Sequence, residues 1–212
     1  MAGIGVRLNK IYEKNTITTD LYGAGYSIVV TIAPMLVVIG ALIFMEWKLE
    51  FSTLGFAARE LFSCTILYIF IFALLTASPF NSVLSRYMSD VIYEEKYEDI
   101  LPCYYLGLFL NIFLSSLVGI PFCIHEFVVG KVDIIYVFTG YCGYIALVLT
   151  FYSMLYLSIC KDYKKISGFF TLGMIVSALF SLVFRFLLMW SITYSILLAL
   201  TIGFTLVAAL EF

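Results

Sequence analysis

This chain of 212 residues is poor in the side chains that carry most enzyme chemistry. It has one histidine, His125, and charged residues make up only 12% of the sequence. With a net charge of −2, it lacks the basic stripe that displaces counterions from phosphates, which argues against a nucleic-acid-binding protein. Metalloprotease, serine-hydrolase and phosphate-loop motifs are also absent. We therefore do not expect an enzyme.

Cysteine is present but is not arranged for metal binding or redox chemistry. The five cysteines are scattered in or beside apolar segments and form no Cys-x-x-Cys motif: Cys64, Cys103, Cys123, Cys142 and Cys160. A buried free cysteine behaves as a small hydrophobic residue. We expect reduced, structural cysteines, no metal and no cofactor.

The first residues lack the features of a cleavable signal peptide. Residues 1–20 contain three basic side chains but no apolar core and no small-residue cleavage site. We predict that residues 1–25 form a weakly amphipathic cytoplasmic lead-in at the membrane interface. The segment that follows is expected to be retained as both signal and anchor.

Apolar residues are abundant: they make up 63% of the sequence, and the mean hydropathy is +1.07. They fall into six stretches, each close to the roughly 20 residues that a helix needs to cross a bilayer. These stretches are residues 26–45, 61–84, 102–124, 134–160, 167–190 and 193–210. We therefore predict an all-α, multi-pass membrane protein with six transmembrane helices. Pro34 and Pro79 are expected to kink the first two helices, and Pro102 to begin the third.

Lysine and arginine predict the orientation of these helices. With the N-terminus inside, the inner segments hold eight basic residues and the outer segments three, and Arg185 lies within the fifth stretch. The positive-inside rule therefore places the N-terminus in the cytoplasm. The last apolar run stops at Phe212 without a basic tail. Together with the six helices, this favours half of a larger assembly.

Polar residues at the end of the second stretch are candidates for a transport path, because polar groups in hydrocarbon are costly. Asn81, Arg86 and Asp90 lie there, and the last two are four residues apart on one helix face. Arg86 and Asp90 form either a structural ion pair at the membrane edge or part of the lining of a cytoplasmic mouth. Asn111, in the third stretch, either bonds a neighbouring helix or belongs to the same path.

The fourth stretch carries a stripe of tyrosines. Tyr141, Tyr144, Tyr152 and Tyr156 fall on one helical arc, which Val148 interrupts. The stripe either packs helices together or forms a wet wall that contacts sugars, with Tyr144 and Tyr152 as its central members.

Two further features leave alternatives open. Arg185 lies five residues before Trp190, so it either snorkels to the outer interface or lines a cavity. The connection between the second and third stretches is strongly acidic, and it is either a solvated linker or a docking surface for a cytoplasmic partner. Its acidic residues are Glu94, Glu95, Glu98 and Asp99.

Several short motifs resemble the PelG family of bacterial exopolysaccharide transporters. The sequence opens with MAGIG (Met1–Gly5), and YGAGY (Tyr22–Tyr26) leads into the first stretch. SRYMSD (Ser85–Asp90) is similar to that family's Arg-Tyr-x-x-Asp element, and KDYKK (Lys161–Lys165) also fits. The resemblance covers essentially the whole chain.

The resemblance implies one six-helix lobe of a twelve-helix, MATE-like flippase in the bacterial cytoplasmic membrane. It implies movement of a Pel-type amino-sugar polymer, with a cytosolic glycosyltransferase and a membrane cyclic-di-GMP receptor as partners. The alternative is a self-contained six-helix subunit that binds substrate or acts as a scaffold. A sequence that continues past Phe212 with further apolar stretches would favour the transporter.

Overall fold

The fold was analysed in a computed structural model that describes residues 17–94, 98, 100–159 and 163–211. All regular elements within these ranges are helices. They are α2 (Ile17–Lys48), the short 3₁₀ helix η1 (Phe51–Thr53), α3 (Phe56–Tyr93), α4 (Ile100–Val128), α5 (Ile134–Ile159), α6 (Tyr163–Phe186) and α7 (Ile192–Glu211).

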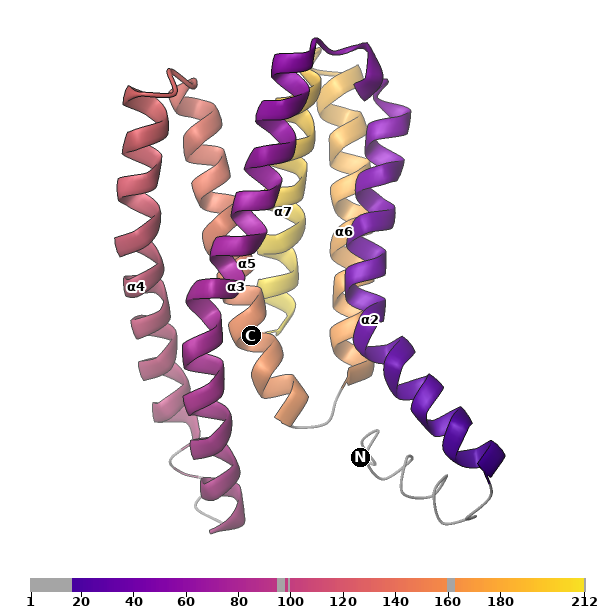
Figure 1. Ribbon diagram of the computed structural model, residues 1–212, viewed down its shortest axis with the longest axis vertical. Helices are drawn as coiled ribbons and strands as arrows, with labels where there is room; N and C mark the ends of the chain where they lie inside the picture. Colours follow the sequence, from indigo (N-terminus) through magenta and orange to yellow (C-terminus); the bar gives the residue numbers. More distant parts are fainter. Residues whose placement is uncertain (1–16, 95–97, 99, 160–162, 212) are drawn as a thin grey trace.

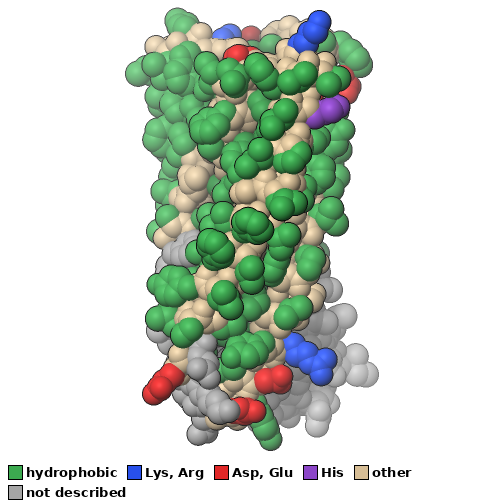
Figure 2. Space-filling view, turned by 90° about the vertical axis from the view of Figure 1, so that its left-hand side faces the viewer, with side chains coloured by type: hydrophobic (Ala, Val, Ile, Leu, Met, Phe, Trp, Pro, Cys, Tyr) green, Lys and Arg blue, Asp and Glu red, His purple; other side chains and the backbone are tan. Residues whose placement is uncertain are grey.

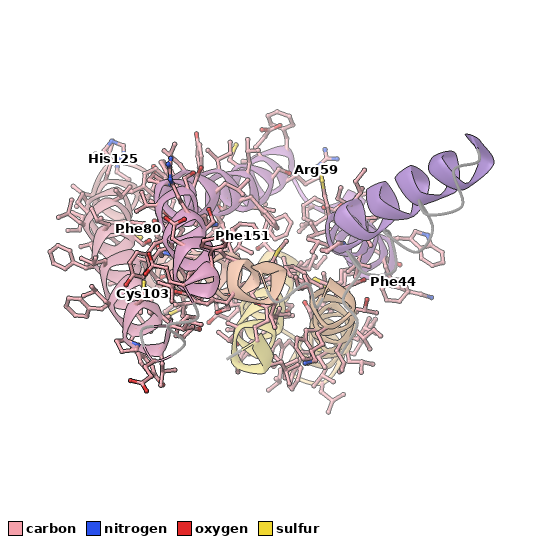
Figure 3. All side chains as sticks on the ribbon, turned by 90° about the horizontal axis from the view of Figure 1, so that it is seen from below. Phe44, Arg59, Phe80, Cys103, His125 and Phe151 are labelled. Atoms are coloured by element: carbon pink, nitrogen blue, oxygen red, sulfur yellow. The ribbon has the colours of Figure 1, made fainter. Side chains whose placement is uncertain are left out.

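The long helices run up and down in a bundle (Figure 1). The upper end carries the connections α2–α3, α4–α5 and α6–α7, and the lower end carries α3–α4 and α5–α6. Seen from below, α4, marked by Cys103 and His125, and α2, marked by Phe44, lie on opposite sides of the molecule (Figure 3).

Helix α7 is the interior element of the bundle. It packs extensively on α5 and α6, and most of its side chains are buried. A glycine pair allows α6 and α7 to approach closely, since a Cβ at Gly203 would lie 2.8 Å from the carbonyl oxygen of Gly173. Small residues of this kind let membrane helices pack backbone to backbone. Helix α2 packs on α6, whereas α3 and α4 pack on α5.

Two prolines lie inside the first two long helices, as predicted: Pro34 in α2 and Pro79 in α3. Figure 1 shows α3 bent and the lower part of α2 turned away from the bundle. From Ile32 onward, α2 exposes apolar side chains such as Met35, Ile43 and Trp47.

Five of the six predicted membrane spans coincide with helices that are long and apolar enough to cross a bilayer. They are α3 to α7. Helix α2 covers the first predicted span, and its role as a sixth crossing stays a prediction. Hydrophobic side chains cover the middle of the face in Figure 2, and the coloured charged groups lie near the two ends. That pattern suits a protein surrounded by lipid.

The boundaries of several predicted segments need correction. Helix α4 continues to Val128, so the predicted connection from His125 to Asp133 is shorter. Helix α6 ends at Phe186 rather than near Trp190, which places Arg185 in its last turn. Residues 1–16 of the predicted lead-in, together with Glu95 and Asp99, lie outside the described residues.

Candidate functional site

The predicted site residues fall into separate regions, of which the first is a contact between α4 and α5 that we call the tyrosine seam. Helix α4 contributes four buried residues at intervals of four: Gly107, Asn111, Ser115 and Gly119. Helix α5 contributes Tyr141, Tyr144 and Tyr152.

Hydroxyl groups of the tyrosines bind the neighbouring helices. Tyr152 donates to the carbonyl oxygen of Tyr104 at 2.7 Å. Tyr144 donates to the carbonyl oxygen of Ser115 at 3.2 Å and reaches the hydroxyl of Thr76, on α3, at 3.3 Å. These bonds connect α3, α4 and α5 through apolar surroundings, where an unpaired hydroxyl would be costly.

Glycines make room for these rings. A Cβ at Gly107 would collide with the Tyr152 hydroxyl, and one at Gly119 would lie 2.9 Å from the Tyr144 ring. Tyr144 and Tyr152 are 5% and 0% exposed, so both are enclosed within the bundle. This geometry is that of helix–helix packing; contact of the tyrosines with a sugar stays a prediction.

Asn111 is the unusual member of the seam. Its side chain is fully buried, and neither its amide nitrogen nor its amide oxygen has a hydrogen-bond partner. The antiparallel register places it between the contacts of Tyr144 and Tyr152, at the level of Val148, the residue that interrupts the tyrosine stripe. An unpaired buried amide costs on the order of 1–3 kcal/mol. The predicted bond from Asn111 to a neighbouring helix is not among the contacts of the described residues.

The second region lies on the lower half of α3 and faces outward. We call it the α3 stripe: Ser78, Ser82, Arg86 and Asp90, all exposed and spaced by four residues. Ser82 donates to the carbonyl oxygen of Ser78 at 3.2 Å, so its hydroxyl is satisfied within the helix. The unusual feature of this surface is therefore that two charged side chains, Arg86 and Asp90, lie at the end of a membrane span.

The predicted ion pair is not seen in this structure. The side chains of Arg86 and Asp90 are both described, but no salt bridge between them is recorded. Asn81 is half-buried, and its amide oxygen is enclosed without a partner. A joint role of the three in a transport path stays a prediction.

Arg185 lies apart from both regions, in the last turn of α6. One of its guanidinium nitrogens donates to the carbonyl oxygen of Trp190 at 3.0 Å. The side chain thus extends toward the upper end of the molecule, as the snorkelling alternative predicts.

The acidic connection is described only in part. Glu94 and Glu98 are exposed at the lower end, and Glu94 continues the turn of α3 by donating its backbone N–H to the carbonyl of Asp90 at 2.9 Å. Over the described ranges, the structure does not gather the candidate residues into one site.

Comparison with known proteins decides the family. The family model PelG, described as "Putative exopolysaccharide Exporter (EPS-E)", matches residues 1–212. The chain belongs to the PelG family. No curated protein and no solved structure matches it. PelG is a family of exporters rather than of enzymes, and together with five apolar helices it identifies a multi-pass membrane protein of polysaccharide export.

Sequence reasoning missed two features of this PelG member. The Gly107 to Gly119 face of α4 was detectable as small and polar residues at intervals of four, a pattern typical of close helix packing. Glu211, near the end of α7, has both carboxylate oxygens enclosed without a partner. Within the described ranges, no group of three His, Cys, Asp or Glu side chains is placed to hold a metal ion.

Proposed function

We propose that this chain forms one lobe of a MATE-like flippase that exports a Pel-type exopolysaccharide across the bacterial cytoplasmic membrane. The family match supports export of a polysaccharide. The α3 stripe carries the finer proposal: it is a charged, outward-facing surface below the middle of a helix that exposes apolar side chains such as Leu67, Leu74 and Leu75.

The α3 stripe is a poor surface for lipid. A charged group inside the hydrocarbon costs several kcal/mol unless it reaches water or a partner. Arg86 lies near the lower end of the helical range Phe56–Met88, which is long and apolar enough to cross a membrane, and Asp90 lies two residues beyond it. We infer that the stripe faces a water-filled path, which a second lobe encloses from the other side. The apolar side chains that α2 exposes from Ile32 onward are available for the same contact.

Export in cells tests this proposal. In the complete exporter, Asp90→Ala should remove negative charge from the path and lower secreted polymer several-fold. Glu60→Ala, which removes an exposed carboxylate at the opposite end of α3, is the matched control. Equal secretion by both variants, at equal protein levels in the membrane, would exclude a special role for the stripe.

The proposed orientation places the lower end in the cytoplasm. The excess of basic residues in the predicted inner segments, eight against three in the outer segments, supports it. Single cysteines at positions 131 and 164, in a cysteine-free background, should react with a membrane-impermeant maleimide from the outside and the inside, respectively. The reverse labelling pattern would overturn the orientation.

We further propose that the acidic connection docks the polymer or a basic face of the glycosyltransferase, near the membrane cyclic-di-GMP receptor. Charges act over about one Debye length, roughly 8 Å at physiological salt. Replacing all four acidic residues of this connection with lysine should lower export or co-purification of the transferase. The four residues are Glu94, Glu95, Glu98 and Asp99. Wild-type levels of both would leave the connection as a solvated linker.

A further inference from the structure

A groove opens at the upper end of the molecule, away from the α3 stripe and the tyrosine seam. It has a volume of about 720 Å³ and lies between the α4–α5 connection, the α6–α7 connection and the first turns of α5 and α7. Sites for small ligands usually measure about 300–1,000 Å³. The groove can therefore accept a short run of sugar residues.

Aromatic rings form one wall of this groove. Trp190 and Tyr194 line it, with ring centres 5.3 Å apart. Trp190 also stacks on Phe184 at 5.3 Å with an angle of 26° between the rings. One face of the indole is thus supported from behind, and its side chain is still 36% exposed. A flat, supported aromatic surface suits the C–H face of a pyranose ring.

Polar groups complete the lining. Lys131 supplies a cationic donor, Asp133 an anionic acceptor, and Ser191 and Thr193 supply hydroxyls. Lys131 and Asp133 are both exposed. Donors and acceptors beside an aromatic wall match the alternating hydroxyls and apolar faces of a saccharide.

The backbone holds this wall in a defined position. The Arg185 guanidinium donates to the carbonyl oxygen of Trp190 at 3.0 Å. Lys131 and Met189, in the two connections that border the groove, have positive φ values of 51° and 55°. Residues other than glycine keep this conformation only where their surroundings enforce it.

A membrane belt is the ordinary role of tryptophan and tyrosine at helix ends, but it does not account for this wall. Tyr194 belongs to α7, the interior helix, and is only half-exposed. Tyr136, across the groove on α5, is 8% exposed. Trp190 and Tyr194 therefore pack against each other at this groove, and Tyr136 is enclosed rather than presented to lipid headgroups.

We propose that this groove, with Trp190 as its platform and Lys131 and Asp133 as its polar partners, binds a segment of the exported polysaccharide as it leaves the membrane. The proposal rests on the export function proposed above and adds a saccharide subsite at the end opposite the α3 stripe.

The two tryptophans of the chain, Trp47 and Trp190, permit a direct binding test. In full-length protein in lipid nanodiscs, Trp47→Phe leaves Trp190 as the reporter among the residues of this chain, and Trp190→Phe leaves Trp47. Other tryptophans of a longer chain are changed to phenylalanine in both. A soluble N-acetylglucosamine hexamer should change the emission of Trp190 saturably and leave that of Trp47 unchanged. No saturable change at Trp190, or an equal change at both, would overturn the proposal.

Charge variants sharpen this test. In the Trp47→Phe background, Asp133→Asn and Lys131→Gln should each weaken hexamer binding about tenfold, about 1.4 kcal/mol. Glu60→Gln, an exposed carboxylate at the same end outside this groove, is the matched control and should bind normally. Equal affinities for all three variants would contradict the assigned polar partners.

Lipids brominated near the headgroup distinguish the groove from a membrane belt. They should quench Trp190 much less than Trp47, whose side chain is 71% exposed. Equal or stronger quenching of Trp190 would place it in the belt and overturn the proposal. Since neither fluorescence measurement involves transport, their failure is distinguishable from a failure of the export proposal.

Discussion

The tyrosine seam and the α3 stripe both place polar groups in membrane-spanning helices, but they do so in opposite ways. In the seam, the polar atoms are enclosed, and the tyrosine hydroxyls bind neighbouring helices. In the stripe, Arg86 and Asp90 face outward and form no ion pair with another described residue. The polar groups of the seam thus hold helices together, whereas the charges of the stripe are available to water or a partner.

This difference separates structural from functional reasons for a polar residue in a membrane. A hydroxyl bonded to a neighbouring helix stabilises the bundle by roughly 1 kcal/mol. A charge that faces outward contributes no such bond and is costly in lipid, which makes it a functional candidate. Asn111 differs from the other polar residues of the seam. Its side chain is enclosed, as a structural residue would be, but its amide has no hydrogen-bond partner.

The largest expected effect comes from filling the seam. Gly107→Leu places a side chain where the side chains of Tyr152 and Leu84 already lie, so these side chains or the helices that carry them must shift. Overpacking of this kind costs about 1–3 kcal/mol, occasionally more. The midpoint of thermal unfolding in detergent should fall clearly.

Gly40→Leu is the control for that substitution. Nothing lies within 4 Å of a Cβ at Gly40, which is on the open face of α2. Its unfolding midpoint should stay near that of the wild type. An equal loss in the two variants would mean that the seam is no more tightly packed than the open face of α2.

The sequence was sufficient to predict the helices that form the seam but not the contacts between them. Apolar runs predicted the spans of α3 to α7, because a helix must satisfy its own backbone in lipid. The tyrosine stripe of α5 was also detectable. That Asn111 lies opposite the gap at Val148 depends on how α4 and α5 are aligned, and no local pattern specifies this register.

For the α3 stripe, too, the sequence predicted the helix but not the contacts of its side chains. Spacing by four correctly placed Arg86 and Asp90 on one helix, but it could not show whether they pair. It also could not show which face of α3 the bundle buries, because exposure depends on where α4 and α5 pack. The predicted end of the fifth stretch was wrong by several residues for a related reason: the apolar run continues through Leu187 to Trp190 after the helix has ended.

The second-largest effect should have the opposite sign. Asn111→Leu replaces an unpaired, fully buried amide by an apolar side chain of similar volume. Removing the desolvation cost should stabilise the bundle by about 1–2 kcal/mol, which thermal unfolding in detergent measures. Ser116→Ala, which removes the acceptor of the Tyr141 hydroxyl at 3.0 Å, should instead destabilise it. A loss of stability in Asn111→Leu would show that the amide has a partner in the native protein, such as an ordered water.

A smaller loss is expected from Tyr144→Phe. This change removes one hydroxyl that reaches both Thr76 and the carbonyl oxygen of Ser115. Bonds between membrane helices average about 0.6 kcal/mol, so the unfolding free energy should fall by roughly 1 kcal/mol. Tyr105→Phe, at a ring that is 58% exposed, is the matched control and should leave stability unchanged. Indistinguishable unfolding curves for the two variants would mean that apolar packing, and not hydrogen bonding, stabilises the seam.

The smallest effect on stability, and the sharpest contrast with the seam, should come from Arg86→Gln. The side chain is exposed and forms no ion pair within the part of the chain that the structure describes, and substitutions at such positions usually change stability by less than about 0.5 kcal/mol. Export should nevertheless fall, because a charge in the proposed path is lost, so unfolding and secreted polymer need to be measured on the same variant. Arg59→Gln, an exposed arginine at the upper end of α3, should change neither quantity. If Arg86→Gln lowers stability as much as Tyr144→Phe does while export per folded protein stays normal, the stripe is structural, and the distinction between the two regions fails.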